Sequence, residues 1–215
     1  MPVKAVVFDL DGTLLDSREL ILDSYHYACD VVLGHRLADA DLLDMVGVPL
    51  QLQMQKLVPE ASEAMVKAYR ENNHRRNDEL IGYFAGTREA LAKLRERGYP
   101  LAIVTSKLRA FALAGLKRYA LEDNFEFLIG ADDCPTYKPD PGPLLLAAER
   151  LAQDPQDCVY IGDSPYDMQA ATAAGMYAVG AEWGLFDRER LLAAGAQMVL
   201  STISEVPDAV VGLDR

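Results

Sequence analysis

Six short apolar runs, separated by stretches with helical spacing, constrain the fold of this chain more than any other feature. The runs have strand length and cover residues 3–8, 101–104, 127–129, 159–161, 177–179 and 198–200. Helices are predicted between them at residues 88–97, 109–119, 143–153, 166–174 and 188–194. Regular alternation of strands and helices indicates a parallel sheet with helices on both faces. The sequence therefore predicts an α/β fold with a Rossmann-like core, which binds its ligand at the carboxyl ends of the strands.

One long interval breaks this alternation. Between Asp16 and Tyr83 no strand is predicted, and apolar residues at helical spacing begin after Ser17, which is expected to cap the first helix. Further helices are predicted at residues 42–45, 50–57 and 61–77. We interpret residues 16–83 as an inserted all-helical cap domain, and residues 1–15 and 84–215 as the catalytic core. The alternative is a set of extra helices packed rigidly on the sheet.

Composition excludes some classes of partner. The 215 residues carry a formal net charge of −12, which repels nucleic acid and anionic membranes, so neither is expected as a partner. The three cysteines are scattered and lack the spacing of a metal site. The first residues resemble neither a signal peptide nor a membrane span, so a cytoplasmic location is expected. A monomer and a homodimer both remain open.

Two carboxylates follow the first apolar run. Asp9 and Asp11 are two residues apart, and residues at this spacing share one face of a strand. Gly12 then allows a sharp turn and brings backbone N–H groups close to whatever lies there. Converging acids at a strand end suit metal binding or covalent chemistry. The structural alternative is a strand that ends in a polar turn.

Polar groups of complementary kinds follow three other predicted strands. They are Thr105, Lys138, and the pair Asp163 and Asp167. Carboxylates are ligands that Mg²⁺ prefers, and hydroxyl and amine groups bind phosphate oxygens. Each segment alone also has a structural explanation, since Thr105 could cap a helix and Lys138 could lie in a rigid surface loop. Gly162, Asp163 and Ser164 could likewise form a turn and a helix cap.

Together these four motifs resemble those of the haloacid dehalogenase superfamily of phosphohydrolases. The motifs are Asp9 with Asp11, Thr105, Lys138, and Asp163 with Asp167, and the insertion resembles the helical cap of that superfamily. The resemblance implies a small phosphorylated substrate and a Mg²⁺ cofactor.

The resemblance also implies roles for individual residues. Asp9 would be the nucleophile that forms an aspartyl-phosphate, and Asp11 would be the general acid and then the general base. Thr105 and Lys138 would hold the phosphoryl group. The metal site would consist of Asp9, the backbone carbonyl of Asp11, and Asp163, with Asp167 supporting the metal shell. Gly12 and Ser106, which adjoin these motifs, are expected to bind substrate.

The substrate is less constrained by the sequence. Dehalogenases of the superfamily lack the second acid of the first motif, so Asp11 disfavours that reaction. Sugar-phosphate mutases usually have a histidine where this chain has Ile21. The remaining resemblance is to phosphoglycolate phosphatases and, through cap residues 65–80, to bacterial pyrophosphatases. We therefore expect pyrophosphate or 2-phosphoglycolate, with a sugar-phosphate phosphatase or a phosphoglucomutase-like enzyme as the alternative.

Three cap residues are candidates for recognising the rest of the substrate. Arg70 and His74 lie four residues apart on one predicted helix, and Gly47 lies in a predicted specificity loop. A solvated helix face and a plain turn between helices explain them equally well. A phosphorylatable signalling module of the receiver type is the competing class of protein. It is disfavoured because receivers are much shorter and carry their phosphorylated aspartate on the third strand.

Overall fold

Six parallel strands form one sheet in the computed structural model, which describes residues 2–213. Their order is β5-β4-β1-β6-β7-β8. The strands are β1 (Ala5–Phe8), β4 (Leu101–Val104), β5 (Phe127–Ile129), β6 (Cys158–Gly162), β7 (Tyr177–Ala181) and β8 (Met198–Leu200). All six match predicted strands, so the α/β fold class with a Rossmann-like parallel sheet is confirmed. β1 is central, with β4 on one side and β6 on the other.

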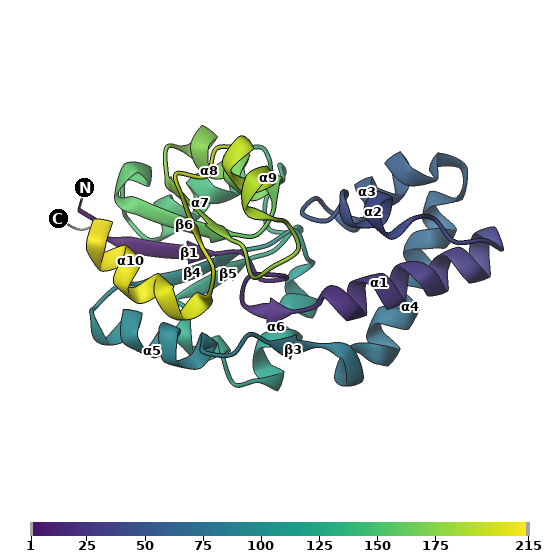
Figure 1. Ribbon diagram of the computed structural model, residues 1–215, viewed down its shortest axis with the longest axis horizontal. Helices are drawn as coiled ribbons and strands as arrows, with labels where there is room; N and C mark the ends of the chain where they lie inside the picture. The colour runs from purple at the N-terminus through teal and green to yellow at the C-terminus, as the bar shows by residue number, and fades with distance from the viewer. Residues whose placement is uncertain (1, 214–215) are drawn as a thin grey trace.

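Helices cover both faces of the sheet (Figure 1). One face carries α5 (Thr87–Glu96), α6 (Arg109–Arg118) and α10 (Val206–Leu213), and the other carries α7 (Gly142–Arg150), α8 (Pro165–Ala174) and α9 (Arg188–Ala193). Three short 3₁₀ turns complete this part: η3 (Glu122–Asn124), η4 (Pro155–Asp157) and η5 (Ile203–Glu205). Alternate residues of β1 face opposite layers, because Val6 and Phe8 pack in the first core and Ala5 and Val7 in the second. α10 was not predicted.

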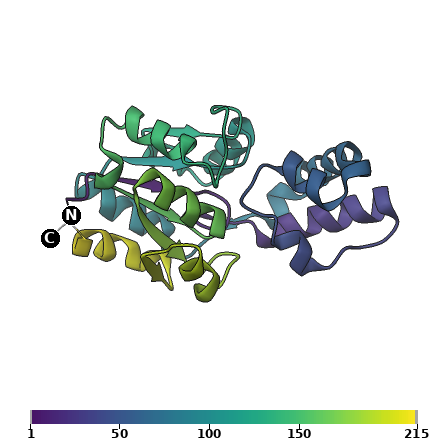
Figure 2. The same cartoon turned by 90° about the horizontal axis from the view of Figure 1, so that it is seen from above.

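A separate group of helices lies to one side of the sheet and its covering layers (Figures 1 and 2). It consists of α1 (Arg18–Ala28), η1 (Cys29–Leu33), α2 (Asp39–Leu43), α3 (Leu50–Leu57), η2 (Pro59–Ala61) and α4 (Ser62–Leu80). The group has a core of its own, in which Tyr25, Met54 and Met65 are fully buried. The helices do not cover a face of the sheet, so the prediction of an inserted all-helical cap is confirmed.

The two chain crossings between sheet and cap form a short ribbon. β2 (Leu15–Asp16) pairs antiparallel with β3 (Gly82–Tyr83), where no strand was predicted. A ladder of two residues is too short to leave a periodic pattern in the sequence. Ser17 does precede α1, but the prediction that its side chain caps the helix was wrong, because that side chain makes no capping hydrogen bond. No helix in residues 2–213 is long and apolar enough to cross a membrane.

Candidate active site

The end of β1 places Asp9 in the middle of the sheet. Its backbone N–H donates to the carbonyl of Ile161 on β6 at 2.8 Å. The chain then turns at Gly12, whose φ is +82°, and a Cβ there would lie 2.1 Å from Oδ2 of Asp163. Only glycine fits this turn, as expected. The N–H of Gly12 already donates to the carbonyl of Leu15 at 2.8 Å, so Gly12 mainly leaves room for Asp163.

Lys138 connects the acids of two strands. Its side chain is 2 % exposed, and Nζ donates to Oδ1 of Asp9 at 2.8 Å and to Oδ1 of Asp167 at 2.6 Å. The carboxylates therefore raise the pKa of the ammonium group, although burial opposes them. Lys138 is thus a buried charged residue, and the alternative of a rigid surface loop does not hold for its side chain.

Tyr160 on β6 is a site residue that the sequence analysis missed. Its hydroxyl accepts from Nζ of Lys138 at 3.1 Å and lies 2.9 Å from Oδ1 of Asp167. Burial, reinforced by Asp167 and Asp9, raises the pKa of Tyr160 well above its ordinary value, so the phenol stays neutral. A tyrosine inside an otherwise aliphatic buried strand was the available signal, because its hydroxyl needs a partner.

Three buried carboxylates converge at this edge of the sheet. Ligand oxygens of Asp9, Asp163 and Asp167 all lie within 4.8 Å of one another. Burial raises the pKa of Asp9 to about 7, against the opposing effect of Lys138, and burial with the neighbouring carboxylates raises the pKa of Asp163 well above its usual range. The buried ammonium group of Lys138 bonds to Asp9 and Asp167, and Asp163 adds a third carboxylate, so a divalent cation would offset the excess negative charge. A set of oxygen ligands fits a hard cation.

Asp167 is held by the protein on both oxygens. Oδ2 accepts from the backbone N–H and the hydroxyl of Ser164 at 3.0 and 2.5 Å, and Oδ1 accepts from Lys138. Ser164 caps α8 in a capping box with Asp167, so the turn-and-cap explanation of this segment is also correct. Asp163 makes fewer hydrogen bonds, because within the described part of the chain its Oδ2 accepts only from the backbone N–H of Leu185, at 2.8 Å. Asp163 is therefore better placed than Asp167 to bind an ion.

Asp11 lies outside this buried cluster. Its carboxylate accepts from Nζ of Lys107 at 2.9 and 3.0 Å, and both side chains are nearly one-fifth exposed. The two acids of the first motif thus have different cationic partners: Lys138 for Asp9 and Lys107 for Asp11. Both acids nevertheless line one cavity.

The cavity lies between core and cap and has a volume of about 270 Å³. The core contributes the motif residues Asp9, Asp11, Thr105, Lys138 and Asp163, together with Ser106 and Lys107. The cap contributes Gly47, Gln53, Tyr69, Arg70 and Asn73 among its lining residues. Three predicted site residues do not line the cavity. Gly12 is buried at the turn after β1, Asp167 is fully buried behind Lys138, and His74 is an exposed residue of α4.

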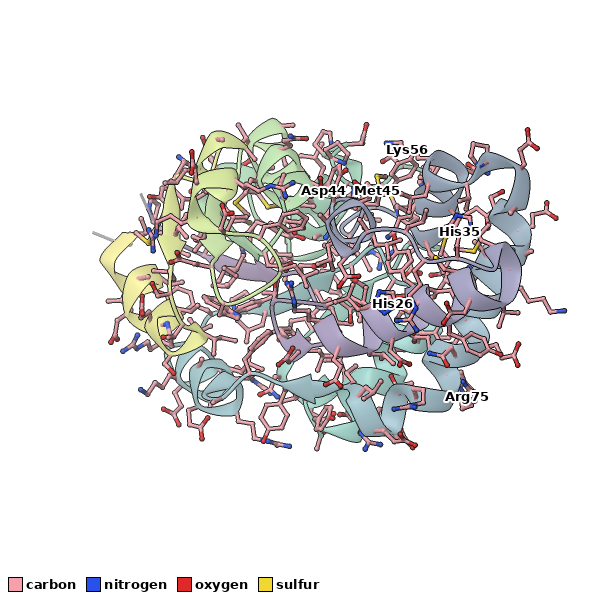
Figure 3. All side chains as sticks on the ribbon, turned by 45° about the vertical axis from the view of Figure 1, so that its right-hand side comes forward. His26, His35, Asp44, Met45, Lys56 and Arg75 are labelled. Atoms are coloured by element: carbon pink, nitrogen blue, oxygen red, sulfur yellow. The ribbon has the colours of Figure 1, made fainter. Side chains whose placement is uncertain are left out.

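A short cap loop touches the core at the cavity. Ser106 Oγ donates to the carbonyl of Gly47 at 2.6 Å, so these two predicted substrate-binding residues bind each other. A Cβ at Gly47 would lie 2.7 Å from the ring of Tyr166, which leaves no room for a side chain. Asp44, labelled in Figure 3, pairs with Arg190 of α9 at 2.7 Å. These contacts hold residues 44–47 against the sheet side of the molecule.

Comparison with known proteins identifies the class of enzyme to which this site belongs. A profile of the family described as haloacid dehalogenase-like hydrolase matches residues 6–181. The chain therefore belongs to the haloacid dehalogenase-like hydrolases, as its resemblance implied. Family and site together define a phosphohydrolase of small phosphorylated compounds with a buried aspartate cluster that can bind a metal.

Individual relatives have more specific names. A protein of Bacillus velezensis, "Pyrophosphatase PpaX", is 35% identical over 204 residues, which cover 95% of this chain and 94% of that protein. A protein of Bacillus pumilus with the same name is 33% identical over 212 residues, covering 99% and 98% of the two chains.

Solved structures share the whole fold. The crystal structure of a hydrolase from Pseudomonas syringae is similar at a TM-score of 0.88 and 26% identity, covering 99% of this chain and 100% of that one. The structure of a predicted phosphoglycolate phosphatase from Haemophilus somnus is similar at a TM-score of 0.85, with 96% and 97% of the two chains covered. Its identity is 22%, so this likeness shows the fold alone.

Proposed function

We propose that this protein is a Mg²⁺-dependent pyrophosphatase that works through an aspartyl-phosphate on Asp9. One observation carries the proposal. A single cavity collects Asp9, Asp11, Thr105 and Lys138 with Asp163, and adds the cations Lys107 and Arg70 beyond them. The first set suits a transferring phosphoryl group, and the two further cations suit an anionic leaving group.

The proposed metal ligands are Asp9, Asp163 and the backbone carbonyl of Asp11. Mg²⁺ would neutralise charge on the transferring phosphoryl group and on the attacking carboxylate. Asp167, whose oxygens are all hydrogen-bonded within the protein, is proposed to orient Lys138 rather than to bind the ion directly. Lys138 in turn orients Asp9 through their hydrogen bond.

In the first step a carboxylate oxygen of Asp9 attacks one phosphorus of pyrophosphate. The bond between that phosphorus and the bridging oxygen breaks, and its electron pair stays on the bridging oxygen. Asp11 gives this oxygen a proton, so orthophosphate leaves and Asp9 carries the phosphoryl group. Thr105 and Lys138 hold the phosphoryl oxygens throughout, which is where charge develops.

In the second step a water molecule attacks the phosphorus of the aspartyl-phosphate. Asp11, now ionised, takes a proton from this water, and the bond between phosphorus and the Asp9 oxygen breaks. The electron pair returns to the Asp9 carboxylate, a second orthophosphate is released, and Asp11 is again protonated. Two displacements replace one difficult reaction, and the protein ends in its starting state.

The relatives and the cavity favour pyrophosphate over a monoester. Both relatives are named pyrophosphatase, and pyrophosphate presents a second phosphoryl group to Lys107 and Arg70. The second candidate is 2-phosphoglycolate, whose carboxylate matches the same two cations with a smaller charge.

The boundaries of core and cap are proposed to lie at the β2–β3 ribbon, close to residues 15 and 84. A cytoplasmic location is proposed as well, which the three free cysteines support.

The test is kcat/KM with Mg²⁺ for pyrophosphate, 2-phosphoglycolate, acetyl phosphate and a panel of sugar phosphates. We expect pyrophosphate to exceed each of the others by about tenfold or more, because its second phosphoryl group offers Lys107 and Arg70 more negative charge than the carboxylate of 2-phosphoglycolate or the neutral part of the other substrates. A preference of that size for 2-phosphoglycolate would replace the proposed substrate. Equal values across the panel would overturn the idea of a dedicated pyrophosphatase.

A further inference from the structure

Lys107 occupies a fixed position beside the group that the proposed mechanism uses as an acid. Its backbone N–H donates to Oγ1 of Thr105 at 3.2 Å, and its carbonyl accepts from the N–H of Ala131 at 2.9 Å. The backbone of Lys107 is therefore held next to a proposed phosphoryl-binding residue. From this anchor its ammonium group reaches both oxygens of Asp11.

This ion pair conflicts with the proposed task of Asp11. A carboxyl group that gives a proton to the bridging oxygen must face that oxygen, yet both oxygens of Asp11 accept from Lys107. The pair is partly exposed to the cavity, where solvent weakens the attraction, so an anion of higher charge can compete for Lys107. The leaving phosphoryl group of pyrophosphate is such an anion.

Two more groups on the same cavity have no hydrogen-bond partner among the residues that the structure describes. Ser17 is fully buried, and its Oγ has no hydrogen-bond partner in residues 2–213. Buried hydroxyls without a partner are uncommon and call for an explanation. Arg70 reaches the cavity from α4, and its guanidinium group makes no hydrogen bond or ion pair within the described part of the chain. Each part of the molecule thus contributes one hydrogen-bond donor to the cavity: Lys107 from the core, Ser17 from the segment that joins core and cap, and Arg70 from the cap.

We propose that Lys107, Ser17 and Arg70 form a subsite for the leaving phosphoryl group, and that Lys107 exchanges Asp11 for this group when pyrophosphate binds. The exchange frees the carboxyl group of Asp11, which takes up a proton from solvent and then faces the bridging oxygen. This subsite rests on the proposed function, because it binds the phosphoryl group of pyrophosphate that is not transferred to Asp9. A monoester with a neutral leaving group does not displace Lys107 from Asp11. The subsite thereby couples the charge of the leaving group to the position of the acid.

The first experiment compares two substrates in Lys107→Met. Pyrophosphate needs the subsite, whereas p-nitrophenyl phosphate has a leaving group that needs neither a cation nor a proton. Loss of a charge-assisted contact should lower kcat/KM for pyrophosphate by about a hundredfold, but that for p-nitrophenyl phosphate by less than about fivefold. Lys117→Met is the matched control, because Lys117 is exposed on α6 and does not line the cavity. Equal losses for both substrates in Lys107→Met would overturn the subsite.

The second experiment measures binding without turnover. Calorimetric titration with Mg²⁺ compares imidodiphosphate, which resists hydrolysis, with orthophosphate. Lys107→Met should weaken imidodiphosphate by about tenfold or more and orthophosphate by less than about twofold. Ser17→Ala should weaken imidodiphosphate selectively as well, and it removes no hydrogen bond within residues 2–213, so its fold is expected to persist. Unchanged affinity for imidodiphosphate in both variants would contradict the proposal.

The two proposals fail in different ways. If the wild-type protein prefers a monoester to pyrophosphate, the proposed function is wrong. If pyrophosphate is preferred but Lys107→Met and Ser17→Ala keep that preference, only the subsite is wrong.

Discussion

The two ends of the cavity differ in how their polar groups are held. At the core end, Lys138 lines the cavity and bonds to Asp167 and Tyr160 behind it, and all three side chains are fully or almost fully buried. At the cap end, neither the exposed guanidinium group of Arg70 nor the hydroxyl of Ser17 has a hydrogen-bond partner among residues 2–213. Groups fixed by the protein need no reorganisation during reaction, whereas unpaired groups are available to a ligand. The difference supports our proposal that the core end serves a step common to all substrates and that the cap end selects among them.

The largest expected effect is at Asp9, the proposed nucleophile. Asp9→Asn should lower kcat/KM by about 10⁴-fold or more for every phosphorylated substrate, because an amide oxygen cannot form the acyl-phosphate. Steady-state kinetics on pyrophosphate and p-nitrophenyl phosphate check this. Asp41→Asn, at an exposed position of α2, is the matched control and should keep full activity. Strong loss on one substrate alone would break the assignment of a common step to the core end.

Lys138→Met should affect both activity and stability. The substitution leaves Asp9 and Asp167 buried without their cation, which costs about 3–5 kcal/mol of unfolding free energy. Activity should fall by about a thousandfold, again on all substrates, because the phosphoryl group loses a fixed positive charge. Urea unfolding and kcat/KM measure the two effects, with Lys117→Met as the control. Wild-type stability in Lys138→Met would contradict the buried network.

When metal is removed, the free energy of unfolding should fall as pH rises towards neutrality. The pKa of Asp9 is raised from 3.8 to about 7, so the folded state binds more protons than the unfolded state in that range. This group therefore stabilises the fold at low pH and loses that contribution as pH rises from about 4 to about 7. Mg²⁺ binds the ionised carboxylates, so its stabilising effect should grow over the same range.

Thermal unfolding at about pH 5 and about pH 7, with a chelator or with Mg²⁺, tests this prediction. Asp9→Asn should reduce both the loss of stability with rising pH and the gain from Mg²⁺. A Mg²⁺ effect that is the same at both pH values would contradict the charge balance inferred for the cluster.

The smallest expected effect distinguishes two residues of one cap helix. Arg70 lines the cavity and His74 does not, although they lie four residues apart on α4. Arg70→Ala should raise KM for pyrophosphate by about tenfold, while His74→Ala should change it by less than about twofold. p-Nitrophenyl phosphate should be insensitive to both. Equal effects of the two variants on KM would contradict the inference that a cap residue must line the cavity to bind substrate.

The core end could largely be predicted from the sequence because its residues follow strands. Parallel strands end at one edge, so Asp9, Thr105 and Asp163 were expected together and line one cavity. Tyr160 was missed because it lies inside β6, where a buried side chain ordinarily contributes only to core packing. The capping role of Asp167 was not distinguished from a metal role, since one carboxylate can serve either purpose.

The cap end was harder to predict because it depends on how two separately folded parts meet. Helical spacing placed Arg70 and His74 on one face, but the orientation of α4 against the core brings Arg70 to the cavity and leaves His74 away from it. The contact of Ser106 with Gly47 joins residues 59 positions apart and leaves no trace in local sequence. The Lys107–Asp11 pair is likewise a product of tertiary packing.

The most direct test of the central claim is detection of the covalent intermediate. Asp11→Asn should block its hydrolysis but still allow transfer from p-nitrophenyl phosphate, whose leaving group needs no proton. After rapid mixing with Mg²⁺ and acid quench, mass spectrometry should find a phosphoryl group on Asp9, with p-nitrophenolate released in a burst of about one equivalent. Release of p-nitrophenolate without any phosphorylated Asp9 would contradict the account.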